Sequence, residues 1–214
     1  MRMNKQIRIA SWNIAGAHKY TSSDHLNYEA EDISYFAEQL KRVDPDIIFL
    51  QETHLNSDRS IARDIANLLN YENVYEVDVS PSHIDSNFRL GNAIISKAPL
   101  SHIKDAYYPY PDFELRFPNG KLARDRHDKM VQIYKFGDIM ICNTQMCPLS
   151  LFGYSYVEGL GKEIALQIED ILIDNLTTPL IFAGDFNTDE PEQAYPKLVN
   201  KLGKLNYSPR IVLD

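Results

Sequence analysis

The sequence predicts an α/β (α+β) fold in which mixed β-sheets are flanked by helices. Short apolar runs bounded by turn formers, such as residues 46–52, indicate buried strands. Residues 29–43 instead place apolar side chains at helical spacing, which is typical of an amphipathic helix. Gly137 and Asp138 separate two further strand-like segments and form a two-residue hairpin signal. Hairpins therefore occur beside strand–helix–strand crossovers along the same chain.

The expected elements follow one another with recognisable boundaries. They are a strand at 7–13, a polar surface loop at 18–28, a helix at 29–43, a strand at 46–52, a helix at 57–69, strands at 71–79 and 91–96, a surface excursion at 101–120, hairpin strands at 131–136 and 139–145, a helix at 158–176, a buried strand at 180–183 and a short helix opening with Pro191. Ser57 is the expected cap of the second helix, and Pro191 suits a first helical turn.

The excursion at 101–120 is rich in Tyr, Pro and Asp. Long loops in compact domains tend to be functional or mobile, so this segment is expected near the rim of a site. Two interpretations of its aromatic side chains stay open. The rings either pin the loop to its own domain or form an apolar platform for a base, a lipid or a partner.

Oxygen-bearing polar side chains stand where four of the predicted strands end. They are Asn13, Glu52, Asn143 with Gln145, and Asp185 with Asn187. Ligands of open α/β sheets bind at the carboxyl edge of the strands, so these side chains suggest one shared site. Carboxylates and carboxamides without a Cys/His cluster suit a hard cation such as Mg²⁺. Single residues of this kind also occur simply as turn formers, but Glu52 is a poor turn former after a mostly apolar run.

Five ordered motifs carry a resemblance to a known family. They are Ser-Trp-Asn-Ile at 11–14, Leu-Gln-Glu-Thr at 50–53, Gly-Asn-Ala-Ile-Ile-Ser-Lys at 91–97, Asn-Thr-Gln at 143–145 and Gly-Asp-Phe-Asn at 184–187. In order and rough spacing the chain resembles the endonuclease/exonuclease/phosphatase superfamily, the DNase I-like proteins, over residues 8–188. The resemblance implies a single domain over residues 1–214, built as a four-layer sandwich of two mixed sheets with helices outside.

The resemblance also implies roles for the metal and the attacking water. Glu52 is similar to the principal Mg²⁺ ligand of the family, with Asn13 beside it, and Mn²⁺ is expected to substitute. The metal would polarise the scissile phosphate and offset charge on the leaving oxygen. Asp185 matches the carboxylate that orients or activates the water, which is a general-base role.

Other positions match the phosphate side of the family's site. Asn143 and Asn187 would donate amide hydrogens to phosphoryl oxygens, and Asn92 would help to shape the pocket. Family members commonly carry a His where this chain has Gln145. Glutamine donates a hydrogen bond but carries no charge and delivers no proton, so a strict replacement is expected to slow turnover.

A second departure concerns the family's C-terminal Ser-Asp-His motif, which this sequence does not contain. The base it supplies and the closing strands of the second sheet are therefore expected to be missing. The expected function is Mg²⁺-dependent hydrolysis of phosphoester bonds, as a phosphodiesterase, nuclease or phosphatase, with reduced activity. Two alternatives stay open: a non-catalytic member that binds a phosphorylated ligand or a protein, and a fragment whose exposed sheet edge pairs with another chain.

Charge and composition limit the substrates and the location. The formal net charge is −8, which argues against non-specific binding to long duplex nucleic acid. A basic stretch is present but is interrupted by acidic residues, which favours a solvated loop; it contains Arg116, Lys121, Arg124, Arg126 and Lys129. The expected substrate is a nucleic acid, a nucleotide, a phosphorylated small molecule or a lipid headgroup. With two cysteines and no apolar run long enough to span a bilayer, a cytoplasmic location is expected.

Overall fold

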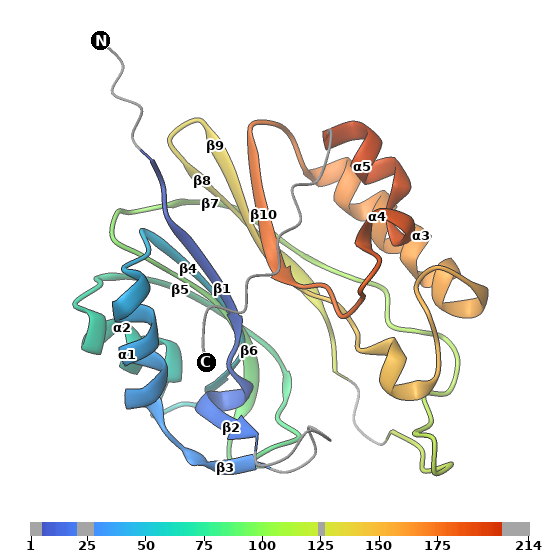
Figure 1. Cartoon of the computed structure of the whole chain (residues 1–214), viewed down its shortest axis with the longest axis horizontal. Coiled ribbons are helices and arrows are strands. Elements are labelled where there is room, and N and C mark those ends of the chain that lie inside the picture. Colours follow the sequence, from blue (N-terminus) through green and yellow to red (C-terminus); the bar gives the residue numbers. More distant parts are fainter. Residues whose placement is uncertain (1–5, 21–27, 124–126, 203–214) are drawn as a thin grey trace. The chain divides into compact units, whose positions relative to one another are not determined.

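The computed structural model describes residues 6–20, 28–123 and 127–202 (Figure 1). The chain divides into two compact units. The first contains Met1–Ser101 with Ala183–Asp185, and the second contains His102–Phe182 with Phe186–Asp214. Strands and helices mix in each unit, which confirms the predicted fold class. A single domain over residues 1–214 stays a prediction.

The first unit contains a four-stranded mixed sheet. Its strands are β1 (Ile9–Asn13), β4 (Ile47–Leu55), β6 (Arg89–Ser96) and β5 (Asn73–Pro81), in the order β1-β4-β6-β5. The pair β1–β4 is parallel, whereas β4–β6 and β5–β6 are antiparallel. Helices α1 (Ile33–Val43) and α2 (Ile61–Leu69) cover one face of this sheet (Figure 1). Their apolar stripes pack against Ile48, Leu50 and Ala93 of the sheet.

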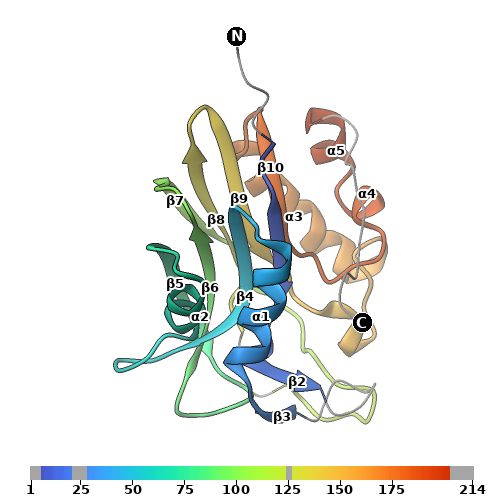
Figure 2. The same cartoon turned by 60° about the vertical axis from the view of Figure 1, so that its left-hand side comes forward.

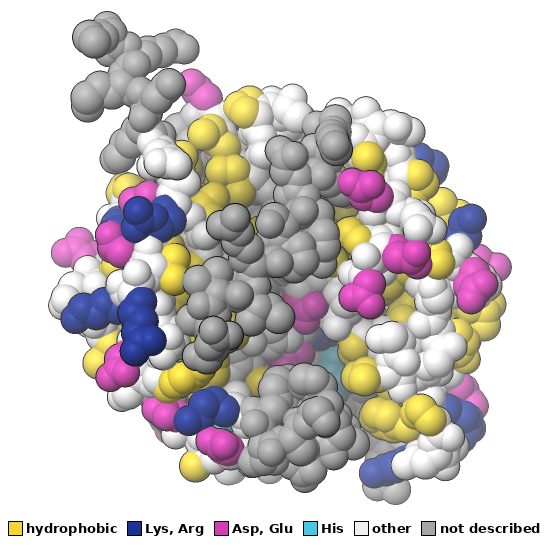
Figure 3. All heavy atoms as spheres, in the orientation of Figure 1, with side chains coloured by type: hydrophobic (Ala, Val, Ile, Leu, Met, Phe, Trp, Pro, Cys, Tyr) yellow, Lys and Arg dark blue, Asp and Glu magenta, His cyan; other side chains and the backbone are white. Residues whose placement is uncertain are grey.

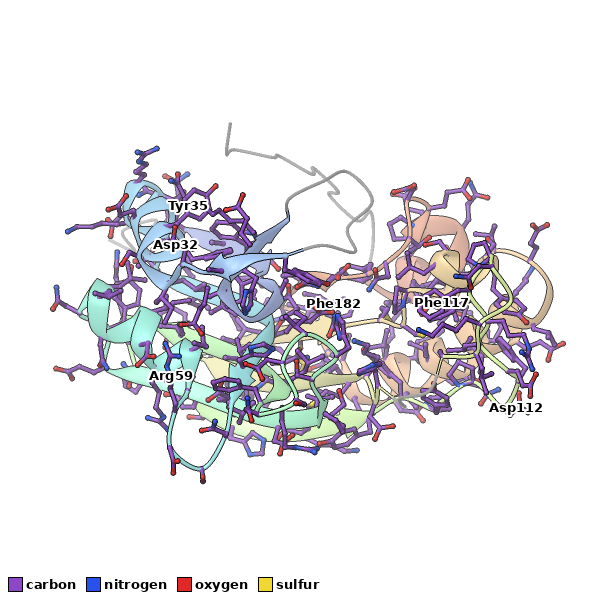
Figure 4. All side chains as sticks on the ribbon, turned by 90° about the horizontal axis from the view of Figure 1, so that it is seen from below. Asp32, Tyr35, Arg59, Asp112, Phe117 and Phe182 are labelled. Atoms are coloured by element: carbon purple, nitrogen blue, oxygen red, sulfur yellow. The ribbon has the colours of Figure 1, made fainter. Side chains whose placement is uncertain are left out.

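Both helices of the first unit begin later than the sequence indicates. Helix α1 starts after Asp32, whose carboxylate accepts from the backbone N–H of Tyr35 at 3.0 Å (Figure 4). The residues before it form β3 (Tyr28–Glu31), which pairs with β2 (His18–Tyr20). The two ends of the expected surface loop at 18–28 are therefore strands. The residues between these strands lie outside the described part of the chain. Ser60 rather than Ser57 caps α2, because the Ser60 hydroxyl accepts from the N–H of Arg63 at 3.1 Å.

The second sheet has the strand order β10-β9-β8-β7. These strands are β7 (Ser101–Tyr107), β8 (Met130–Phe136), β9 (Ile139–Gln145) and β10 (Leu180–Asp185). Helix α3 (Gly159–Asn175) packs its apolar face against β8 and β9, and α4 (Pro191–Ala194) and α5 (Pro196–Leu202) follow β10 (Figure 2). Short 3₁₀ turns complete the elements, η1 at Ala15–Ala17 and η2 at Leu149–Phe152. The predicted hairpin and the long helix are confirmed.

Two expectations about the second half of the chain are wrong. Residues 101–107 form β7 instead of a loop; most of this strand is exposed, so no apolar alternation marks it in the sequence. The strand at 180–183 was expected to be buried, but every residue of β10 is partly exposed.

Within the described residues, no helix has the length and apolar content needed to cross a membrane.

Aromatic side chains of residues 108–123 pack onto the second unit. The Phe113 ring lies 4.6 Å from that of Tyr154, and the Phe117 ring lies 5.1 Å from that of Phe152 (Figure 4 marks Phe117). Tyr108 is buried and its hydroxyl hydrogen-bonds the Thr144 hydroxyl at 2.7 Å. These contacts favour the interpretation in which the rings pin the loop to its own domain.

Candidate active site

Asn13 and Asp185 are joined by a hydrogen bond in the first unit. The Asn13 side-chain amide donates to Oδ2 of Asp185 at 3.0 Å, and the Asn13 carbonyl Oδ1 accepts from the backbone N–H of Ala15 at 3.1 Å. Together these bonds fix which end of the carboxamide is oxygen and which is nitrogen. Two residues that lie 172 positions apart are therefore placed side by side, as their positions at strand ends predict.

Glu52 interrupts the regular pairing of β4. The register passes from Gln51 opposite Asn92 to Thr53 opposite Gly91, so Glu52 is the extra residue of a β-bulge. Its φ is +53°, in the left-handed region that non-glycine residues rarely adopt. Regular alternation would turn Glu52 to the face of Leu50, among the apolar side chains beneath α1 and α2. The bulge releases the carboxylate from that alternation.

The strand opposite the bulge carries a glycine for a steric reason. A Cβ at Gly91 would approach the Val77 carbonyl oxygen to 2.7 Å and the Thr53 hydroxyl to 3.0 Å. A side chain there would push the neighbouring strands away from the bulge. Gly91 therefore belongs to the backbone arrangement that displays Glu52, and its role is more specific than the sequence motif indicates.

Asn92 lies in the same cross-strand row as Asn13. Gln51 is the register partner of both residues, on β1 and on β6. Asn92 is 2% exposed, and its Nδ2 has no hydrogen-bond partner among the described residues. An unsatisfied buried donor costs about 1–3 kcal/mol. An oxygen of a ligand would satisfy this donor, which fits the predicted place of Asn92 on the phosphate side of the site.

His54 packs beneath the turn that follows Asn13. Its ring is fully buried, stacks on Phe88 at 5.1 Å and hydrogen-bonds the Ser82 hydroxyl through Nε2 at 2.8 Å. A Cβ on Gly16 would overlap the Nδ1 and Cε1 atoms of this ring. Burial, followed by the neighbouring His18, lowers the pKa of His54 to about 4. The ring is therefore neutral near pH 7 and fixes the Asn13 turn against β4.

In the second unit Asn143 is paired inside the hairpin. Its amide donates to the Gln132 side-chain carbonyl at 3.1 Å, across a register in which the two residues are directly opposite. Both residues are 0% exposed. Gln132 was not predicted as a site residue, although a glutamine inside the otherwise apolar β8 is a detectable signal. The predicted Asn143 contact with phosphate stays a prediction.

Gln145 and Asn187 stand where β9 and β10 end. Gln145 is buried and lies opposite Met130 in the register. The Asn187 amide donates to the backbone carbonyl of Met146 at 2.8 Å, and its φ is +49°. Asn187 thus contacts the residue that follows Gln145. Asparagine adopts this left-handed conformation more readily than most residues.

The seven predicted site residues divide between the units. Asn13, Glu52, Asn92 and Asp185 belong to the first unit, and Asn143, Gln145 and Asn187 belong to the second. The structure brings Asn13 to Asp185 and places Glu52 and Asn92 beside Gln51, the register partner of Asn13. That all seven form one site stays a prediction.

The donor set of the first unit fits a hard cation. Carboxylate and carboxamide oxygens come from Glu52, Asp185 and Asn13, which is the ligand chemistry of Mg²⁺. No group of three His, Cys, Asp or Glu side chains suited to a metal ion occurs in the described part of the chain. A Mg²⁺ ion held here would complete its shell with water and substrate oxygens, as such sites commonly do.

On the face drawn in Figure 3, the described charges do not form one basic patch, because Lys and Arg side chains are interspersed with Asp and Glu. Within the basic stretch, Lys121 is exposed and exposed Arg116 pairs with Glu114 at 2.6 Å, as expected for a solvated loop. Arg124 and Arg126 lie outside the described residues. Lys129 differs, because it is buried.

Comparison with known proteins decides the family. A model of the Endonuclease/Exonuclease/phosphatase family matches residues 10–210. The chain belongs to this family. Its members hydrolyse phosphoester bonds, and the match confirms the resemblance that the five ordered motifs of the sequence indicate. No curated protein matches the chain.

Solved structures share the fold. An endonuclease/exonuclease/phosphatase from Beutenbergia cavernae superposes with a TM-score of 0.59 at 21% identity, over 92% of this chain and 52% of that one. A mannosyl-6-phosphatase from Bacteroides thetaiotaomicron gives 0.53 at 16% identity, over 92% and 71%. The human Nocturnin catalytic domain with bound sulfate gives 0.52 at 17% identity, over 90% and 68%. This chain thus spans about half the length of the first of these proteins.

Proposed function

We propose that this chain hydrolyses phosphoester bonds with Mg²⁺, and that Mn²⁺ can replace it. The observation that carries the proposal is the strained bulge that displays Glu52, next to the strand whose Asn13 is bonded to Asp185. A left-handed backbone at a carboxylate is costly and persists where the surroundings enforce it. The proposed role of Glu52 as a metal ligand explains why the strained backbone conformation occurs at this residue.

Glu52 and the Oδ1 atom of Asn13 would hold the metal. Oδ1 accepts one hydrogen bond, from Ala15, and a carbonyl oxygen has two lone pairs. When bound, Mg²⁺ supplies charge that polarises the phosphoester and stabilises the leaving oxygen. The carboxamide is pre-oriented for this role because both of its ends are already bonded.

Asp185 would position and deprotonate the attacking water. The hydrogen bond from Asn13 holds its carboxylate in one orientation. A carboxylate fixed in this way can accept a proton from water that attacks in line with the leaving group.

Amide groups would contact the phosphoryl oxygens. The unsatisfied donor of buried Asn92 supports this role, and Asn143, Gln145 and Asn187 are proposed as further donors. These side chains are neutral, so they stabilise developing charge less than a protonated His would. The substrate would be a nucleic acid, a nucleotide, a phosphorylated small molecule or a lipid headgroup.

A second candidate function is non-catalytic binding of a phosphorylated ligand or a protein. The specific observation that favours it is Gln145 at the position where the family commonly has His. In this case the predicted site residues would keep their ligand contacts while the chemical step is lost. The same experiment separates the two functions.

The test is hydrolysis of bis-p-nitrophenyl phosphate by the 214-residue chain, with Mg²⁺, with Mn²⁺ and with a chelator. Asp185→Asn should reduce kcat while the melting-temperature shift caused by Mg²⁺ persists, and Glu52→Gln should abolish both the turnover and the shift. Glu72→Gln, at an exposed carboxylate, is the control and should behave as wild type. Metal-independent turnover would contradict the proposal, whereas a Mg²⁺ shift without turnover would favour the binding function.

A further inference from the structure

Glu76 is a partly buried carboxylate on the helix-covered face of the first sheet. Its register partner on β6 is Ala93, which packs in the apolar cluster beneath α1 and α2. Directly opposite residues of neighbouring strands share a face, so Glu76 lies on that side of the sheet. Burial raises the pKa of the Glu76 carboxyl, and hydrogen bonds from Ser60 and Thr53 oppose this rise. Acidic side chains seldom occur among apolar ones without specific partners, so these partners indicate what Glu76 does.

The Glu76 carboxylate holds the residue that follows the bulge. The Thr53 hydroxyl donates to Oε1 of Glu76 at 3.0 Å, and Thr53 is 0% exposed. This bond runs diagonally across β6, because the register partner of Thr53 is Gly91 whereas that of Glu76 is Ala93. A Cβ at Gly91 would lie only 3.0 Å from the Thr53 hydroxyl oxygen. The glycine therefore leaves open the path over which Thr53 reaches Glu76.

The bulge decides which of two side chains faces Glu76. Without the bulge, Glu52 would lie opposite Gly91 and would turn to the helix-covered face. The bulge gives this position to Thr53 and releases Glu52 from the alternation. A hydroxyl donates a hydrogen bond to the Glu76 carboxylate, whereas a second carboxylate in the same place would be repelled by it. Glu76 therefore favours the bulged register by attraction and disfavours the regular register by repulsion.

Glu76 is also fixed from the side of helix α2. The side chain of Ser60, which caps this helix, hydrogen-bonds the Glu76 carboxylate. Ser60 further forms an isolated β-bridge with Leu55, two residues beyond Thr53 on β4. A negative charge near the first turn of a helix is favourable. The carboxylate is thus joined to β4 and to α2 at once, which restricts its position beside the bulge.

We propose that Glu76 is a positioning residue for the metal site, which sets the register of β4 through Thr53 and so presents Glu52 to Mg²⁺. Glu76 acts through the backbone of β4 and contacts neither the metal nor the substrate. The inference rests on the proposed function for the role of Glu52 as a ligand. The register itself can be measured without a metal.

The first test measures the backbone of Glu52 by NMR in metal-free protein. A positive φ brings the amide and α protons of one residue close together, so Glu52 of wild type should show a strong intraresidue nuclear Overhauser effect. Glu76→Leu removes both the acceptor of Thr53 and the repelling charge, and should lose this signal. Glu76→Gln keeps an acceptor and should retain it. The control is Val74→Ala, a partly buried residue of the same strand and apolar cluster, which should lower the melting temperature and keep the signal.

The second test measures binding of Mg²⁺ alone by calorimetry. The dissociation constant should rise about tenfold in Glu76→Leu and in Thr53→Val, because each variant removes the bond that fixes the bulge. Thr53→Ser keeps the hydroxyl and should match wild type, as should Val74→Ala. In hydrolysis of bis-p-nitrophenyl phosphate, the half-saturating Mg²⁺ concentration should rise in parallel, whereas the rate at saturating Mg²⁺ should change less. Thr53→Val carries both tests if Glu76→Leu does not fold.

Two outcomes would overturn the role of Glu76. One is an unchanged Glu52 signal and Mg²⁺ affinity in both Glu76→Leu and Thr53→Val. The other is an equal loss in Val74→Ala, which would show that any destabilisation of this face has the same effect. A Glu52 signal that depends on Glu76 while Mg²⁺ affinity does not would likewise reject the positioning of a metal ligand.

The same measurements separate this proposal from the proposed function. Mg²⁺ affinity that depends on Glu76, without any turnover, would support the positioning role and reject the hydrolase. Turnover with a Mg²⁺ dependence that is the same in wild type, Glu76→Leu and Thr53→Val would leave the hydrolase intact and reject the positioning role.

Discussion

The two units hold their predicted site residues by different physical means. In the first unit irregular backbone positions the site residues. A bulge displays Glu52, and Gly16 leaves room for the His54 ring beneath the Asn13 turn. In the second unit a regular hairpin ladder carries Asn143, which is held by a side-chain bond to Gln132. Added side-chain atoms should therefore lower the stability of the first unit most. Loss of a hydrogen-bond partner should lower the stability of the second unit most.

Added bulk in the first unit should produce the largest effect on stability. Gly16→Ala introduces a Cβ that overlaps His54, at a residue with φ of +65°. Overpacking together with left-handed strain should lower the free energy of unfolding by about 3 kcal/mol, measured by urea denaturation. The double variant Gly16→Ala/His54→Ala should lose less than the sum of the two single variants.

The second unit offers a matched control for this prediction. Gly137 has a φ of +59°, but a Cβ there meets nothing within 4 Å. Gly137→Ala should therefore cost only the backbone strain, about 1 kcal/mol. Equal losses for the two alanine variants would show that contact with His54 contributes nothing.

Acid should weaken the first unit through His54. Its pKa is about 4 in the folded protein against an ordinary 6.5, so the unfolded chain binds the proton first as the pH falls. The contribution of His54 to the free energy of unfolding should be constant above pH 6.5. It should decline between pH 6.5 and 4, by about 3 kcal/mol in all. The measurement is urea unfolding at several pH values with a chelator present. His54→Gln should lack this component, and an identical pH dependence in that variant would contradict the assignment.

Loss of a polar partner should produce a smaller effect in the second unit. Gln132→Leu removes the acceptor that the buried Asn143 amide contacts at 3.1 Å, which should cost about 2 kcal/mol. Replacement of both partners, as Gln132→Leu/Asn143→Leu, should recover part of this loss because both polar groups of the bond are then removed. Additive losses in urea denaturation would mean that the bond does not stabilise the hairpin.

Much of the fold could be predicted because its signals are local. The hairpin and α3 follow directly from apolar periodicity and from the turn residues Gly137 and Asp138. The strand β7 escaped prediction because an exposed edge strand such as Ser101–Tyr107 has little apolar alternation. The start of α1 was misplaced because residues 29–31 pair with β2, a tertiary contact that helical periodicity does not reveal.

The candidate site was predictable in its residue types but not in its geometry. Strand ends identified Asn13 and Asp185, and the structure joins them. The bulge at Glu52 depends on the register between β4 and β6, which a single strand does not encode. Lys129 was grouped with exposed cations, since charge patterning says nothing about burial.

The central claim is that the bulge at Glu52 displays a carboxylate that holds Mg²⁺ for phosphoester hydrolysis. The most direct test is the Mg²⁺ concentration dependence of bis-p-nitrophenyl phosphate hydrolysis, measured for wild type, Glu52→Asp and Glu52→Gln. The account predicts saturable activation in wild type, a higher half-saturating Mg²⁺ concentration in Glu52→Asp and no activation in Glu52→Gln. Equal Mg²⁺ dependence in all three proteins would contradict it.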